Sequence, residues 1–170
     1  MIIVTGADNT GKSTLVDHIA DKFGIMKVDR YHTLPPVDYV DWYRWVKQVL
    51  DTRTHSIIDR FFVDEFVYGP LKRGKISLPE PKLGQLKYMF YRHRPLIIVC
   101  ETDLETIEST YEQREQYPNL DEIPLVMAKF REVMDSEPFS ECPVWYHNFT
   151  EPHAAEMTDR VVNIYLKSRR

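Results

Sequence analysis

The stretch Gly6-Ala7-Asp8-Asn9-Thr10-Gly11-Lys12-Ser13 decides the fold of this chain. It fits the pattern G-x-x-x-x-G-K-[ST] at every defined position. The two glycines allow the backbone to curl, so that successive N–H groups face an anion. A helix that follows adds the partial positive charge of its N-terminus. The stretch is therefore predicted to be a loop that binds the phosphates of a nucleotide.

The sequence on both sides of this loop supports that prediction. Residues 1–5 form an apolar run that predicts a buried strand. Residues 12–23 carry Leu15, Ile19 and Phe23 at helical spacing, which predicts a helix directly after the loop. A strand, a glycine-rich loop and a helix in this order are the context in which the motif is specific.

The chemistry of phosphate binding assigns roles within the loop. Lys12 has the length to reach the β- and γ-phosphates, and the Ser13 hydroxyl is a ligand for Mg²⁺. ATP and Mg²⁺ are the expected cofactors. The residues predicted to hold the nucleotide are Gly6, Asn9, Thr10, Gly11, Lys12, Ser13 and Thr14.

Beyond the loop, short apolar runs alternate with helical patterns. Further strands are predicted at 25–28, 56–58, 96–100 and 144–147, and further helices at 37–52, 61–69, 82–92, 104–116, 120–134 and 151–167. The alternation is typical of a parallel sheet flanked by helices. We predict one α/β domain over 1–170 with the three-layer P-loop NTPase fold. It has about five parallel strands, a loop at 71–81 and a short lid near 108–120.

Composition limits the partners. The 170 residues carry a net charge of −4, which argues against a surface for a nucleic-acid polymer or an anionic membrane. Apolar runs are all shorter than the roughly 20 residues of a membrane span. Cys100 and Cys142 have neither metal-ligand spacing nor the number for a disulfide framework. Because functional sequence begins almost at Met1, we expect a cytoplasmic protein without a leader segment.

A second informative patch is the run from Ser56 to Arg60. Asp59 ends an apolar strand, which is where this fold places an acidic residue of the Mg²⁺ shell. Ligands gather at the carboxyl ends of parallel strands, so Asp59 and Gly6 are expected to face one cleft. Arg60 offers a forked cation for a phosphate. The alternative is a surface Asp-Arg turn pair without a ligand.

The loop and this patch together resemble the thymidylate kinase and deoxynucleoside kinase group of P-loop enzymes. Thymidylate kinases carry an aspartate two residues after the first glycine, where this chain has Asp8. They also carry Asp-Arg-Tyr, then serine, then Ala-Tyr-Gln, at fixed spacing. At the same spacing this chain has Asp59-Arg60-Phe61, then Asp64, then Val67-Tyr68-Gly69. Such a short and divergent version is expected of a phage-encoded relative, which would act in the host cytoplasm.

The resemblance implies roles for several residues. It implies that Asp8 binds the sugar 3′-hydroxyl of the acceptor and that Arg60 binds the acceptor phosphate. It further implies that the segment around Phe66 and Tyr68 packs near the base, and that the protein is a homodimer. Asp64 stands where the family has serine, and its carboxylate either accepts a hydrogen bond from a base substituent or faces water. The identity of the base therefore stays open.

Two further groups of residues are candidates for the transfer chemistry. Asp29 and Arg30 follow the predicted strand at 25–28. Arg30 favours a phosphate acceptor, whereas Asp29 would be the general base that a hydroxyl acceptor requires. A solvated turn that binds no ligand is the third alternative for this pair. Arg114 lies in the predicted lid and is a candidate for stabilising the transferred charge. A helical salt bridge is the alternative for Arg114. Arg131 is a further candidate for the transferred charge, with a solvated helix residue as its alternative.

Aromatic residues gather in two predicted helices, and two interpretations are open. They either stack on the base or belong to the core, and aromatic residues at helical spacing are more often core. The residues concerned are Trp42, Tyr43, Trp45, Tyr88, Phe90 and Tyr91.

The sequence thus favours a deoxynucleoside monophosphate kinase that moves the γ-phosphoryl group of ATP onto a pyrimidine deoxynucleotide, such as dTMP or a 5-modified dUMP. Lys12, Asp59, Arg60 and Arg114 are the predicted catalytic residues, and Ser13 and Asp59 the predicted Mg²⁺ ligands. The alternatives are a deoxynucleoside kinase, a kinase for a non-nucleotide acceptor and a nucleotide-gated regulatory ATPase. A guanine-specific switch is disfavoured because the tetrapeptide Asn-Lys-x-Asp does not occur.

Overall fold

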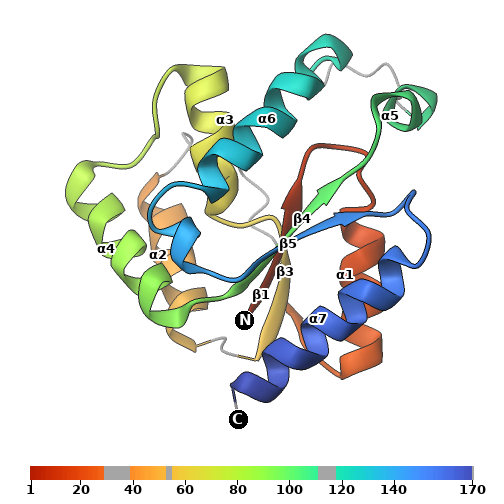
Figure 1. Cartoon of the computed structure of the whole chain (residues 1–170). Coiled ribbons are helices and arrows are strands. Elements are labelled where there is room, and N and C mark those ends of the chain that lie inside the picture. The colour runs from red at the N-terminus through yellow and green to blue at the C-terminus, as the bar shows by residue number, and fades with distance from the viewer. Residues whose placement is uncertain (29–38, 53–54, 111–117, 170) are drawn as a thin grey trace.

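The structure, a computed structural model, describes residues 1–28, 39–52, 55–110 and 118–169. Five parallel strands form a central sheet with helices on both faces (Figure 1). The strands are β1 (Ile2–Gly6), β2 (Met26–Val28), β3 (Ser56–Asp59), β4 (Leu96–Glu101) and β5 (Val144–Asn148). The helices are α1 (Lys12–Phe23), α2 (Tyr39–Thr52), α3 (Val63–Arg73), α4 (Glu80–His93), α5 (Leu104–Thr110), α6 (Ile123–Met134) and α7 (Ala154–Ser168). Short 3₁₀ turns occur at 120–122 and 139–141.

The sheet has the strand order β2-β3-β1-β4-β5, with all neighbours parallel. β1 is therefore central, between β3 and β4. In this register Val4 lies opposite Asp59, and Gly6 lies opposite Cys100. The carboxyl ends of β1, β3 and β4 consequently meet at one edge of the sheet, where ligands bind in open α/β folds. The predicted fold is confirmed.

Successive residues of β1 pack into two different cores. Ile2 and Val4 pack with α1 and α7 on one face of the sheet. Ile3 packs with α2, α3, α4 and α6 on the other face. Side chains of a strand alternate between faces, so a strand covered by helices on both sides has to be apolar throughout. That requirement explains the unbroken apolar runs from which the strands were predicted.

The helices agree with the sequence patterns except around α3. The helix predicted at 12–23 is confirmed residue for residue. α3, however, passes through Gly69 and Pro70 to Arg73, where we expected a break and a loop. A Cβ on Gly69 would lie 2.8 Å from Glu65 Oε1, so this glycine makes room for a buried carboxylate inside the helix. The helix ends instead at Gly74, whose left-handed backbone and N–H bond to the Pro70 carbonyl cap it.

The loop predicted at 71–81 is correspondingly shorter. α4 begins at Glu80 and has Pro81 in its first turn, where a missing N–H costs no intrahelical bond. The bend between α3 and α4 is held by Glu65, which accepts hydrogen bonds from the Arg73 guanidinium at 2.6 Å and from the Ser77 N–H at 2.8 Å. The buried Glu65–Arg73 ion pair and the Ser77 bond thus hold the short connection between α3 and α4 in place.

The aromatic residues of α2 and α4 divide between core and surface. Trp42, Tyr43 and Phe90 are buried in the core, which is the second of the two interpretations. Tyr88 and Tyr91 are 62% and 50% exposed. Trp45 is partly buried and packs against the same core. The six residues therefore do not form one exposed wall for a base.

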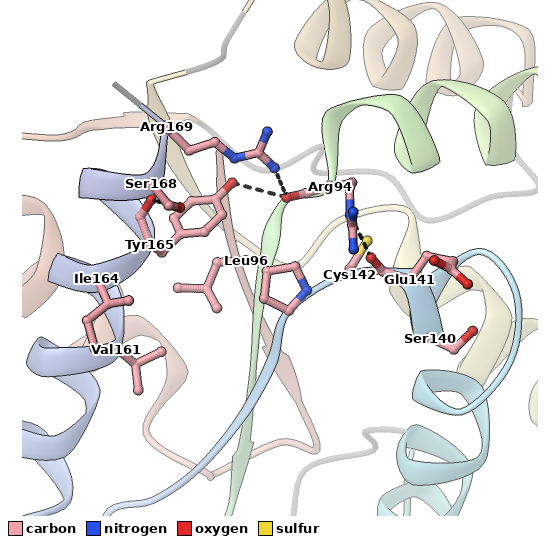
Figure 2. Close-up of a pocket in the computed structure, with 11 residues that line it drawn as sticks. Arg94, Leu96, Ser140, Glu141, Cys142, Val161, Ile164, Tyr165, Ser168 and Arg169 are labelled. Carbon is pink, nitrogen blue, oxygen red and sulfur yellow. Dashed lines mark hydrogen bonds between the residues drawn. The ribbon is translucent and has the colours of Figure 1, made fainter.

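The opposite edge of the sheet, where β4 and β5 begin, carries a cavity of about 650 Å³ (Figure 2). Its lining includes Leu96, Tyr165 and the side chains of Arg94 and Arg169, and none of the predicted site residues. Both guanidinium groups already donate to backbone carbonyls, Arg94 to Glu141 and Arg169 to His93. Across the described part of the chain, every helix is too short or too polar to cross a membrane.

Candidate phosphate-transfer site

The loop between β1 and α1 has the backbone that its glycines predict. Gly6 has φ = 134° and Gly11 has φ = 75°, both in the region that favours glycine. A Cβ on Gly6 would lie 2.2 Å from the Cys100 carbonyl oxygen, so β1 and β4 approach too closely for any side chain there. Asn9 also has a positive φ of 60°, a conformation that asparagine tolerates better than most residues. The loop is thus curled over the N-terminus of α1.

Lys12 is the first residue of α1, and its side chain folds back over the loop. It is only 6% exposed, and its ammonium group donates to the Ala7 carbonyl. The same Nζ atom lies 3.8 Å from Asp8 Oδ1. Thr10 donates its hydroxyl to the Ala7 carbonyl at 2.8 Å, so its side chain closes the loop and leaves phosphate binding to its backbone. Ser13 and Thr14 are exposed.

Ser13 and Asp59 meet as the sequence predicts. The Ser13 hydroxyl donates to Asp59 Oδ2 at 2.6 Å, which joins the start of α1 to the end of β3. The other carboxylate oxygen, Asp59 Oδ1, is buried and has no hydrogen-bond partner among the described residues. A buried unpartnered carboxylate oxygen beside a serine hydroxyl suits a hard cation that prefers oxygen ligands. These two residues therefore fit Mg²⁺.

Arg60 and Asp8 form an ion pair across the same edge of the sheet. The Arg60 guanidinium donates to Asp8 Oδ1, and the two side chains are 28% and 30% exposed. The Arg60 N–H donates to the Val4 carbonyl at 2.8 Å, and the residue has φ = 62°. This left-handed conformation costs a non-glycine residue about 1–2 kcal/mol, and such strain concentrates at functional sites. The Asp8 carboxylate thus lies between two cations, Arg60 and Lys12.

Asp64 is a buried residue that contacts the turn carrying Arg60. Its side chain is buried at the start of α3, where Oδ2 accepts hydrogen bonds from the Thr5 hydroxyl at 3.0 Å and the Phe61 N–H at 3.1 Å. Burial raises the pKa of the Asp64 carboxyl, and the nearby charge of Arg60 opposes that shift. Of the two alternatives for Asp64, the burial of its side chain contradicts the solvated carboxylate.

Phe66 and Tyr68 are each 8% exposed. The Phe66 ring packs against Phe139 at 4.9 Å between centroids, and the Tyr68 ring packs against Phe130 at 6.0 Å. Both therefore belong to the core under α3 and α6. The predicted site residues Asp29, Arg30 and Arg114 lie outside the described residues, as does most of the predicted lid.

Arg131, which the sequence left open, is held in an ion pair. Its guanidinium donates to both oxygens of Glu101 at 2.9 and 2.8 Å, and Glu101 is the last residue of β4. Glu101 has 12% of its side chain exposed, whereas Arg131 has 65%. The sequence places the acidic Glu101 directly after the predicted strand at 96–100, but no local pattern pairs it with Arg131.

Phe149 is a second residue that the sequence did not indicate. It follows β5, and its ring lies 3.3 Å from where a Cβ on Gly11 would be. The side chain is nevertheless 43% exposed, so one part of the ring covers the loop and another faces solvent. Only the strand order brings it there, because β5 ends at the same edge of the sheet as β1.

Comparisons with known proteins agree with this architecture. No protein-family model matches the chain, and no curated protein sequence matches it significantly. Among solved structures, the YorR protein of Bacillus subtilis, in complex with phosphorylated GDP, has a TM-score of 0.74 at 19% identity, covering 99% of this chain and 98% of that one.

Two further structures are similar at lower scores. Deoxyadenosine kinase from M. mycoides with bound dCTP has a TM-score of 0.57 at 14% identity, covering 96% of this chain and 99% of that one. Shikimate kinase from Acinetobacter baumannii in complex with shikimate has a TM-score of 0.54 at 14% identity, covering 98% and 93%. At these identities the likeness is one of fold. The chain shares the three-layer fold of these structures over nearly its whole length.

Proposed function

We propose that this chain is a deoxynucleoside monophosphate kinase that transfers the γ-phosphoryl group of ATP to a pyrimidine deoxynucleotide. One observation carries the proposal. The Ser13–Asp59 contact and the Asp8–Arg60 ion pair lie at one edge of the sheet, with Lys12 belonging to the same loop. The first is suited to a metal-bound triphosphate, and the second brings a forked cation to an acceptor phosphate.

The donor half follows from the loop. Backbone N–H groups of 6–13 would surround the phosphates, and Lys12 would exchange its bond to the Ala7 carbonyl for bonds to phosphate oxygens. Ser13 and Asp59 would hold Mg²⁺, which neutralises charge on the β- and γ-phosphates when bound. Phe149 is suited to stack on the purine ring, because its ring partly covers Gly11 and is partly exposed.

The acceptor half depends on charge. A phosphate acceptor is already ionised at neutral pH and needs cations, whereas a hydroxyl acceptor needs a general base. Of the carboxylates described in this site, Asp8 is paired with Arg60, Asp59 is bonded to Ser13, and Asp64 is buried. The Arg60 guanidinium beside Asp8 favours a phosphate acceptor. Asp29, the general base predicted for a hydroxyl acceptor, lies outside the described residues. Asp8 would then exchange part of its contact with Arg60 for the sugar 3′-hydroxyl.

The similar structures support a kinase in general terms, because a deoxyadenosine kinase and a shikimate kinase share this fold. Four parts of the proposal rest on the sequence motifs. They are the pyrimidine base, a phage-encoded origin, the lid around Arg114 and a homodimer. Action on a small-molecule acceptor without a nucleic-acid polymer or membrane is also part of it, in keeping with the net charge of −4.

The test is an ADP-release assay with matched acceptors. Purified protein with ATP and Mg²⁺ is given dTMP, dUMP, dCMP, a 5-substituted dUMP, dAMP or dGMP, and in parallel the corresponding nucleosides. Lys12→Ala is the control for contaminating kinases. Turnover with one or more pyrimidine monophosphates supports the proposal. Turnover with nucleosides alone would assign a deoxynucleoside kinase, and ADP release without any acceptor would assign a regulatory ATPase.

A further inference from the structure

A buried carboxylate joins the two halves of the candidate site. Asp64 is 5% exposed and has its Oδ2 atom bonded to the Thr5 hydroxyl and to the Phe61 N–H. Thr5 immediately precedes Gly6, the first residue of the phosphate-binding loop, and Phe61 immediately follows Arg60. One oxygen atom thus connects the strand that carries the loop to the turn that carries the arginine.

A second connection runs in parallel with the first. The Arg60 N–H donates to the Val4 carbonyl at 2.8 Å. Arg60 is therefore fixed on both sides, by its own N–H to β1 and by the N–H of the next residue to Asp64. Such anchoring is needed because Arg60 holds a left-handed backbone that an unconstrained chain would leave. Without the Asp64 bridge the turn would lose its side-chain connection to Thr5 of β1 and keep the backbone bond to Val4.

Stability alone does not explain a carboxylate at this position. Burial costs a charged group free energy unless it is fully hydrogen-bonded, and Asp64 Oδ1 is buried without a hydrogen-bond partner in the described part of the chain. A carboxylate that is incompletely satisfied inside a small domain indicates a role in which its position matters more than its contribution to stability. The position here is the connection between loop and arginine.

We propose that Asp64 is a positioning residue that fixes Arg60 relative to the phosphate-binding loop, so that the guanidinium meets the acceptor phosphate in line with the donor. This inference rests on the proposed function. It assigns Asp64 no contact with the base, since the side chain is buried, its Oδ1 atom included.

The test separates the acceptor from ATP. In Asp64→Ala, the acceptor KM is expected to rise about tenfold, the equivalent of one lost hydrogen-bonded contact, while the ATP KM stays within about twofold. Thr5→Val is expected to raise the acceptor KM by a smaller factor. In the double variant the factor is expected to be smaller than the product of the two single-variant factors. Asp64→Asn retains an oxygen that accepts both bonds and is expected to rescue most of the acceptor KM.

A matched control is Val126→Ala, which removes buried apolar volume in α6 and none of the hydrogen bonds of this bridge. If it raised the acceptor KM as much as Asp64→Ala, or if the acceptor and ATP KM rose together in Asp64→Ala, Asp64 would be a general stabilising residue and the inference would be wrong. Multiplicative effects of Thr5→Val and Asp64→Ala would overturn it as well.

A second readout needs no turnover. The Arg60 guanidinium Nε–H signal in ¹H–¹⁵N spectra, assigned by its loss in Arg60→Lys, is expected to be that of an ordered side chain in the wild type and in Asp64→Asn. In Asp64→Ala the signal is expected to be that of a side chain averaging over several conformations. If the wild type transfers phosphate to no acceptor but Arg60 loses order in Asp64→Ala, the proposed function fails and the positioning role stands. An unchanged signal in Asp64→Ala would overturn the positioning role by itself.

Discussion

The Ser13 hydroxyl and the Asp59 carboxylate are 46 residues apart in sequence and 2.6 Å apart in the fold. Their contact depends on the parallel pairing of β1 with β3, which brings the end of β3 beside the loop that follows β1. It leaves one buried oxygen of Asp59 without a partner among the residues described. That geometry leads directly to a prediction about the metal.

Asp59→Asn should reduce turnover about 100-fold or more, because it removes the charge that would hold Mg²⁺ while preserving the side-chain shape. The measurement is a titration of the initial rate with Mg²⁺ at fixed ATP, in which the variant should also need more metal for half-maximal rate. Asp103→Asn, an exposed aspartate after β4, serves as the control and should titrate as the wild type. Equal Mg²⁺ dependence in Asp59→Asn and wild type would contradict the assignment.

Two glycines provide a matched test of the loop geometry. Gly6→Ala should destabilise the fold by at least about 3 kcal/mol, because its Cβ would lie 2.2 Å from the Cys100 carbonyl. Gly84 is inside α4 and a Cβ there would meet nothing within 4 Å, so Gly84→Ala should stabilise by about 1 kcal/mol. Urea unfolding followed by circular dichroism measures both. A Gly6→Ala protein as stable as the wild type would show that β1 and β4 do not approach so closely.

The Asp64 carboxyl predicts a pH dependence of stability. Burial raises its pKa in the folded protein above the ordinary value of 3.8. Between the two pKa values the folded protein binds more protons than the unfolded chain, so this group stabilises the fold most at low pH. Its contribution is then lost as the pH rises through the folded pKa.

Asp64→Asn has no such group, so the free energy of unfolding of the wild type relative to this variant should decrease as pH rises from about 4 towards neutrality. Urea unfolding of both proteins over this range measures the difference. A difference that stayed constant, or that increased with pH, would contradict the raised pKa.

Phe149 predicts an effect on the donor nucleotide alone. Phe149→Ala should raise the ATP KM roughly tenfold, because stacking of a base on an aromatic ring is worth about 1–3 kcal/mol. The acceptor KM should not change. Tyr88→Ala, at a more exposed aromatic residue on α4, is the control and should leave both constants unchanged. A Phe149→Ala protein that binds ATP as tightly as the wild type would remove this ring from the nucleotide site.

The parts of the fold that follow from local patterns were predictable from sequence. The loop from Gly6 to Ser13 fixes the strand before it and the helix after it, and buried strands have to be apolar on both faces. The continuation of α3 through Gly69 and Pro70 was not predictable, because it depends on the Glu65 carboxylate one helical turn earlier filling the space beside Gly69. Glycine and proline carry no signal of such a neighbour.

The candidate site likewise has parts that were predictable from sequence and parts that were not. The contact between Ser13 and Asp59 followed from two motifs and the rule that strands of a parallel sheet end at one edge. Three features required the strand order or side-chain packing: the Asp64 bridge to Thr5, the Glu101–Arg131 pair and the position of Phe149 over Gly11. Each joins residues that are distant in sequence, and no local pattern encodes such a pairing.

The central claim is that phosphate passes from ATP to a deoxynucleotide held by Arg60. The most direct measurement follows γ-³²P-labelled ATP into products separated by chromatography, with pyrimidine deoxynucleoside monophosphates and their nucleosides offered together. We predict label in a deoxynucleoside diphosphate with the wild type, and a loss of about 100-fold in Arg60→Ala. Label in a nucleoside monophosphate alone, or in inorganic phosphate alone, would contradict the claim.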